Sequence, residues 1–164
     1  RALWLGANLI TALLAAASIG IFEATIEKLV ALAILMPIVA SMGGIAGMQS
    51  LALVIRAQAL NQIGYTNSKS LIIKESAIGL LNGLLWSSVV AFLTYLWFGR
   101  VDLGFIIAAA LIINLLIGAI SGVTLPLILT KLNIDPALAG GVILTTITDV
   151  IGFISLLGIA TLMI

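Results

Sequence analysis

Five long runs of apolar residues follow one another along the chain, separated by short segments that hold most of the charged side chains. The runs cover about residues 3–22, 29–55, 76–99, 103–129 and 136–163. An α-helix needs roughly 20 mostly apolar residues to cross the hydrocarbon core of a bilayer. The runs show no strand-type alternation and are far longer than the strands of a membrane barrel. The pattern predicts an all-α integral membrane protein with five transmembrane helices.

The composition agrees with a lipid environment. Of the 164 residues, 63% are hydrophobic and only 8% are charged, whereas soluble domains carry about 25% charged residues. A water-soluble fold of this size could not bury so much apolar surface. We therefore expect residues 1–164 to form a single transmembrane domain in a lipid bilayer.

Two residue types are missing, and this limits the chemistry that the chain can perform. Without cysteine or histidine there is no disulfide, no thiolate metal site and no imidazole base. The spans also offer no pair of nucleophile and base, so an enzyme is not expected. A net charge of +1 provides no basic surface for nucleic acid.

The distribution of lysine and arginine predicts the orientation. With a cytoplasmic N-terminus, five basic residues fall in inner segments and only Lys28 and Arg100 fall in outer loops. The positive-inside rule therefore favours a cytoplasmic N-terminus and a C-terminus outside. The polar stretch from Arg56 to Lys74 then lies on the cytoplasmic side, either as a solvated connector or as a docking surface for a further domain.

Asp149 is the residue that most directly indicates a function, because the sequence places no other ionisable residue well inside a run. A carboxylate at that depth costs at least about 2.5–3.5 kcal/mol, so it should face a bundle interior or water. Small and hydroxyl-bearing residues share its face at helical spacing: Gly141, Thr145, Thr148 and Gly152. This face is typical of a hydrated cation path, but threonine hydroxyls or a neighbouring asparagine could also simply hold the carboxylate.

The second run contains a proline followed by a glycine cluster: Pro37, Gly43, Gly44 and Gly47. The proline removes a backbone donor, and the glycines let another backbone or a hydrated ion come close, so we expect a locally broken helix. Loosened backbone in a bilayer is tolerated only inside protein or beside water. The cluster therefore fits a pore lining, while its Gly-x-x-x-Gly spacing fits plain helix packing equally well. Gln49 follows the cluster and is a further candidate pore residue.

Oxygen is the only kind of ligand atom that these candidates offer, and oxygen ligands select hard cations. Mg²⁺ keeps several of its waters and binds through one or two carboxylates. If two copies of the chain met at a two-fold axis, two Asp149 carboxylates would flank one hydrated ion. The chemistry indicates a hard divalent cation and leaves Mg²⁺, Ca²⁺, Mn²⁺ and Co²⁺ open.

Two segments resemble the MgtE family of magnesium channels. Residues 37–49 resemble the Pro-x₅-Gly-Gly-Asn/Ile-x-Gly-x-Gln signature of that family's second membrane helix, and residues 135–152 resemble its fifth helix. The resemblance implies a homodimeric channel in the bacterial inner (plasma) membrane, with a pore lined by the second and fifth helices at the subunit interface. It implies that Asp149 of both subunits holds Mg²⁺. It also implies cytoplasmic N and CBS regulatory domains, which would precede Arg1 and are absent from this chain.

Two positions depart from the family pattern: Ile45 stands in place of Asn, and Val142 in place of Pro. Neither change affects Asp149. Three functions stay open, namely a passive Mg²⁺ channel, a proton-coupled divalent-cation transporter with Asp149 as its titrating group, and a non-conducting assembly subunit. A coupled carrier should hold a chain of titratable groups across the membrane. The sequence shows only Asp149 and therefore favours the channel.

Overall fold

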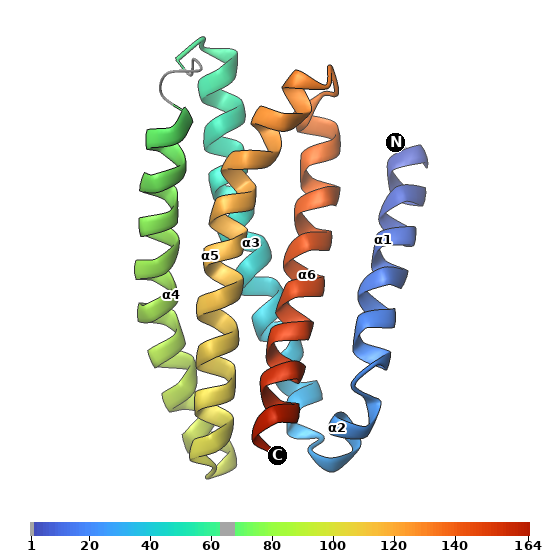
Figure 1. Ribbon diagram of the computed structural model, residues 1–164, viewed down its shortest axis with the longest axis vertical. Coiled ribbons are helices and arrows are strands. Elements are labelled where there is room, and N and C mark those ends of the chain that lie inside the picture. Colours follow the sequence, from blue (N-terminus) through green and yellow to red (C-terminus); the bar gives the residue numbers. More distant parts are fainter. Residues whose placement is uncertain (1, 63–67) are drawn as a thin grey trace.

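The computed structural model describes residues 2–62 and 68–164, and every regular element in this part of the chain is an α-helix (Figure 1). Five helices are long and apolar enough to cross a membrane: α1 (Ala2–Gly20), α3 (Ala31–Ala59), α4 (Ser68–Phe98), α5 (Val101–Lys131) and α6 (Pro136–Met163). A short helix that the apolar pattern did not predict, α2 (Glu23–Lys28), lies between α1 and α3. The predicted all-α membrane fold with five spans is confirmed.

Both ends of the polar stretch between the second and third spans are helical. α3 continues past Arg56 to Ala59, and α4 already begins at Ser68, ahead of Lys74. Lysine, arginine and glutamine are good helix formers, so the end of an apolar run is not the end of its helix. Residues 63–67 and Arg1, which belong to segments discussed above, lie outside the described residues.

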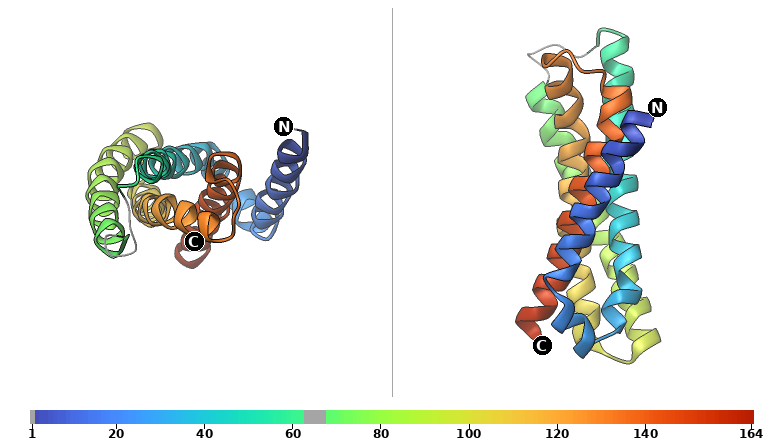
Figure 2. Two further views of the ribbon diagram at one scale, coloured as in Figure 1. Left: turned by 90° about the horizontal axis from the view of Figure 1, so that it is seen from above. Right: turned by 90° about the vertical axis from the view of Figure 1, so that its right-hand side faces the viewer.

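α5 is the central helix of the bundle. It packs against α3, α4 and α6, and α1 lies at one edge, where it contacts α6 (Figure 2). α3 and α4 follow each other in sequence but make few contacts, because each packs on α5 instead. This arrangement leaves a cleft between α3 and α4 and an open groove between α3 and α6.

Glycines let α3 and α5 approach closely. A Cβ placed on Gly118 would lie 2.6 Å from the carbonyl oxygen of Gly43, and one placed on Gly122 would lie 2.3 Å from that of Gly47. No side chain fits at such distances, so a larger residue would push the two helices apart.

The two prolines inside the helices have different effects. α3 runs without interruption through Pro37, so the broken helix expected from the sequence is wrong. Pro37 lies in the second turn, where the missing N–H costs one hydrogen bond and few residues precede the ring. α5 instead bends toward its Pro126 end (Figure 1). Gln58 on α3 donates to the carbonyl oxygen of Pro126 at 3.5 Å, which joins the bent segment to α3.

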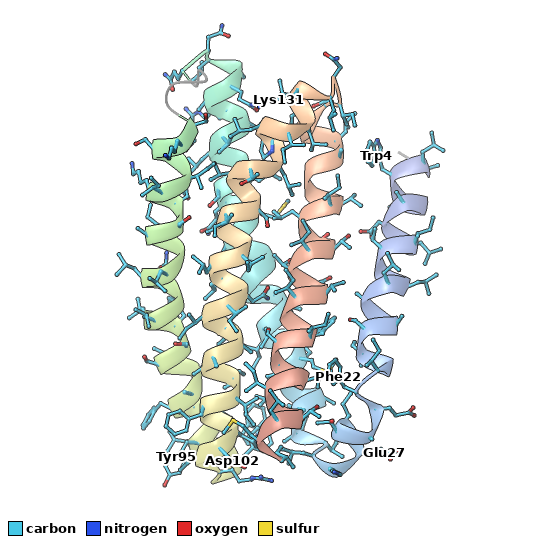
Figure 3. The ribbon with its side chains drawn as sticks, in the orientation of Figure 1. Trp4, Phe22, Glu27, Tyr95, Asp102 and Lys131 are labelled. Carbon is cyan, nitrogen blue, oxygen red and sulfur yellow. The ribbon has the colours of Figure 1, made fainter. Side chains whose placement is uncertain are left out.

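The labelled side chains mark the two ends of the bundle. Trp4 and Lys131 lie at one end, whereas Glu27, Tyr95 and Asp102 lie at the other (Figure 3). At this second end Asp102 forms an ion pair with Arg100. The C-terminus lies at the end opposite to the start of α1, as five spans require (Figure 1).

Candidate cation site

Asp149 lies near the middle of α6. Pro136 occupies the first turn of this helix, and Asp135 caps it by accepting a hydrogen bond from the backbone N–H of Ala137 at 2.9 Å. At 1.5 Å per residue, Asp149 lies about 20 Å from Pro136 and about as far from Met163. The carboxylate is therefore at mid-depth of a spanning helix.

Asp149 lines the open groove between α3 and α6, which has a volume of about 540 Å³. We call this the Asp149 groove. α6 contributes Asp149 and Thr145, and α3 forms the rest of the lining: Ala40, Ser41, Gly44, Ile45, Met48, Gln49 and Ala52. The groove is therefore mostly apolar, with a few oxygen atoms placed around one carboxylate.

The carboxylate of Asp149 is half-buried and makes no hydrogen bond or ion pair with any residue in 2–62 and 68–164. The threonines near it are already occupied. Thr145 Oγ1 donates to the carbonyl oxygen of Gly141 at 3.0 Å, and Thr148 Oγ1 donates to that of Leu144 at 3.1 Å. The alternative in which threonine hydroxyls hold the carboxylate is therefore not observed, and the carboxylate is without a partner among the described residues.

Three of the other predicted site residues, Gly44, Gln49 and Thr145, line the Asp149 groove with the carboxylate. Thr148 is fully buried, and its hydroxyl oxygen lies 3.7 Å from a Cβ placed on Gly44, the one such contact outside the local backbone of α3 among the described residues.

Gly141, the next predicted residue on α6, faces α3. A Cβ placed there would meet the Cε atom of Met48 at 3.5 Å. Gly141 thus adjoins the wall of the groove without lining it.

Gly43 and Gly47 face the bundle interior instead of the groove. A Cβ placed on Gly43 would lie 2.2 Å from Asn114 Nδ2, and one placed on Gly47 would lie 2.9 Å from the carbonyl oxygen of Gly118. The glycine cluster therefore divides by helix face. Gly43 and Gly47 serve close helix packing, and Gly44 leaves the groove open.

Asn114 connects the helices that carry the groove. It is fully buried on α5, and its Nδ2 atom donates to the carbonyl oxygen of Val39 on α3 at 2.8 Å. A Cβ placed on Gly152 of α6 would lie 2.7 Å from the same nitrogen. Asn114 Oδ1 has no hydrogen-bond partner among the described residues. The amide thus lies between α3 and α6, hydrogen-bonded to α3 and close to the backbone of α6 at Gly152.

Sequence reasoning missed several residues of the α3 wall. Ser41, Ile45, Met48 and Ala52 recur three or four residues apart, so they form one helix face beside Gly44. The spacing was the available signal, but most of these side chains carry no distinctive chemistry. Ile45, the position that departs from the family pattern, is 57% exposed on this wall.

Comparison with known proteins gives a consistent set of matches. The family model MgtE, described as a divalent cation transporter, matches residues 36–159. The magnesium transporter MgtE of Bacillus subtilis is 37% identical over 158 residues, 96% of this chain. The proteins of the same name from Thermus thermophilus and Enterococcus faecalis are 31% and 28% identical and cover 99% and 97% of the chain. The matched region spans only 35–36% of the length of these relatives.

Proposed function

Because this chain belongs to the MgtE family of divalent cation transporters, we propose that it forms the membrane domain of a channel through which hydrated Mg²⁺ enters the cell passively. The observation that carries the proposal is Asp149, a carboxylate without a partner among the described residues, at mid-depth of a spanning helix and in an open groove. The names of the relatives support Mg²⁺ as the transported ion.

The size and chemistry of the Asp149 groove suit a cation that keeps its water. Six waters occupy about 180 Å³ at roughly 30 Å³ each, and the groove offers about 540 Å³. The carboxylate would accept hydrogen bonds from the waters of the ion, and the side-chain oxygens of Gln49 and Thr145 provide neutral contacts. Mn²⁺, Co²⁺ and Ca²⁺ have related ligand preferences, so we treat them as competing ions.

A homodimer would complete the pore. In a single chain the groove is open on one side, and Ile45 and Met48 expose 57% and 43% of their surface beside Asp149. A second copy placed across a two-fold axis would cover these apolar side chains and bring a second Asp149 to the ion. The pore would then be lined by α3 and α6 of both subunits.

The membrane potential is sufficient to drive uptake. A divalent ion that crosses 100 mV gains about 4.6 kcal/mol, twice the value for one charge. We place the protein in the bacterial inner membrane with its N-terminus in the cytoplasm and its C-terminus outside. Cytoplasmic regulatory domains of the full-length protein would then act on the pore from the N-terminal side.

The test is Mg²⁺ flux into proteoliposomes, clamped at several potentials and repeated with a proton gradient of either sign. A channel gives a current that follows the electrochemical gradient of Mg²⁺ and ignores pH. Flux that stops without a proton gradient would instead identify a proton-coupled transporter, with Asp149 as the titrating group. Absence of flux under all these conditions would contradict conduction by this domain and favour an assembly subunit.

A further inference from the structure

A second carboxylate, Glu75, is buried inside the bundle. It lies about 10 Å along α4 from Ser68, at 1.5 Å per residue, and is 8% exposed. Ser50 of α3, itself 4% exposed, donates a hydrogen bond to Glu75 Oε2 at 2.8 Å. The sequence placed Glu75 at the edge of an apolar run, and its burial inside the bundle was not expected. The apolar run begins just after Glu75, but the helix begins about two turns before it.

Glu75 lies where two cavities of the α3–α4 cleft meet. Both helices pack on α5 and hardly touch each other, so the cleft stays open between them. One cavity, of about 440 Å³, extends from Glu75 toward Gln62 and Ser70 at the loop end of the cleft. The other, of about 350 Å³, extends from Glu75 toward Asn82 and Trp86, deeper in the bundle. The carboxylate therefore has open space on two sides.

The charge of Glu75 is not balanced by the described part of the protein. No basic side chain in residues 2–62 and 68–164 forms an ion pair with it, and Ser50 supplies the one hydrogen bond to the carboxylate. Lys74 lines the first cavity but is not paired with its neighbour. Burying a carboxylate inside protein with a single neutral donor is costly, so a mobile cation is the partner that would stabilise its charge.

We propose that Glu75, together with Ser50, forms a second binding site for a hydrated divalent cation such as Mg²⁺. Six waters fill about 180 Å³, which either cavity accommodates. Gln49 and Asn82 supply further polar side chains to the deeper cavity. The choice of Mg²⁺ rests on the proposed function, whereas the site itself rests on the geometry of Glu75.

The position of the site relates it to the Asp149 groove. Gln49 and Ile45 of α3 line both that groove and the deeper cavity of the cleft. Glu75 also lies nearer than Asp149 to the end of the bundle at which α4 and α6 begin (Figure 1). A cation at Glu75 would therefore lie beside the ion path and be separated from it by α3. It would be on the side of the bundle that we expect to be cytoplasmic.

Infrared difference spectroscopy on the full chain in lipid tests the site directly, with Asp149→Asn as the background so that the pore carboxylate is silent. We expect added Mg²⁺ to shift a carboxylate stretching band, and this shift to disappear in Asp149→Asn/Glu75→Gln. Asp149→Asn/Glu27→Gln, which changes a glutamate of the short helix α2, should keep the shift. Size exclusion confirms that each variant is folded.

Ser50→Ala offers a second and milder perturbation, because it keeps the carboxylate and removes only its hydrogen bond. We expect the Mg²⁺-dependent shift to persist in Asp149→Asn/Ser50→Ala with a midpoint several-fold higher. A carboxylic acid C=O band that ignores Mg²⁺ and is lost with Glu75→Gln would overturn the proposal, since Glu75 would then be neutral. The same holds if Mg²⁺ produces no shift that depends on Glu75. Neither result bears on conduction, which is measured separately in the chain with Asp149 intact.

Discussion

Gly43 and Gly44 are neighbours in the sequence but meet different surroundings. A Cβ on Gly43 would overlap the amide of Asn114, at 2.2 Å from Nδ2, whereas a Cβ on Gly44 finds only Thr148 Oγ1, at 3.7 Å. Gly44 also lines the Asp149 groove. The two positions therefore form a matched pair, one that tests packing and one that tests the ion path.

We predict that Gly44→Leu folds and assembles normally but lowers Mg²⁺ flux at least tenfold, because its side chain fills the groove beside Asp149. Flux into proteoliposomes measures the effect, and size exclusion verifies the fold. Gly43→Ala is the control and should do the reverse, destabilising the protein by about 1–3 kcal/mol through overpacking against Asn114. A folded Gly44→Leu protein with wild-type flux would show that this wall does not line the ion path.

Asp149→Asn should leave the fold intact and remove most of the Mg²⁺ flux. The carboxylate makes no hydrogen bond or ion pair to the described residues, so its neutralisation breaks no internal contact. We expect a loss of at least tenfold at equal protein density in proteoliposomes. Ser155→Ala is a suitable control on the same helix, since it removes only a bond to the carbonyl oxygen of Gly152. Wild-type transport by a folded Asp149→Ala variant would exclude the pore assignment.

The sequence predicted the site in part. A site residue could be recognised only where it differs clearly from its neighbours in the sequence. Asp149 stands out because it is a charge inside an apolar run, and this contrast requires no knowledge of the neighbouring helices. Glu75 was overlooked because a charge at the start of an apolar run resembles the end of a helix. Gly43 packs against α5 and Gly44 faces α6. The sequence of one helix does not show where the neighbouring helices lie, so this difference could not be predicted.

At the scale of the helices, the close contact between α3 and α5 depends on glycine. We predict that Gly118→Ala lowers stability by about 1–3 kcal/mol, because its Cβ would lie 2.6 Å from the carbonyl oxygen of Gly43. Thermal unfolding in detergent, followed by tryptophan fluorescence, measures the change. Gly6→Ala is the control, since a Cβ there meets nothing within 4 Å. Equal melting temperatures for the two variants would show that α3 and α5 are not held by this contact.

The helices themselves were largely predictable, whereas their ends and bends were not. Hydropathy marks the five spans because only lipid tolerates such runs. It does not mark the ends of the helices. α3 continues past the charged Arg56, and α4 begins before the charged Lys74. A proline in the sequence does not by itself predict a bent helix. α3 is continuous through Pro37 near its start, whereas α5 bends toward its Pro126 end (Figure 1).

At the scale of the whole molecule, the proposed dimer can be tested with single cysteines, because the chain contains none of its own. We predict that Met48→Cys, on the exposed wall of the Asp149 groove, forms a disulfide between two subunits under mild oxidation. Leu81→Cys is the control, because Leu81 is 67% exposed on α4, away from this groove. Non-reducing gel electrophoresis separates dimer from monomer. Dimer formation by Leu81→Cys alone would place the interface on another face.

The few contacts between α3 and α4 have a consequence for how the protein is made. α3 bonds to α5 through Val39 and Asn114, which are 75 residues apart in the chain. At roughly 5–20 residues per second, a ribosome needs several seconds to make the intervening segment. During that time the glycine face of α3 lacks the helix on which it packs, since α4 makes few contacts with α3. Synthesis of α5 is thus the step that gives α3 its partner, and a nascent chain that stops before it would present an unpaired α3 to the proteases of the membrane.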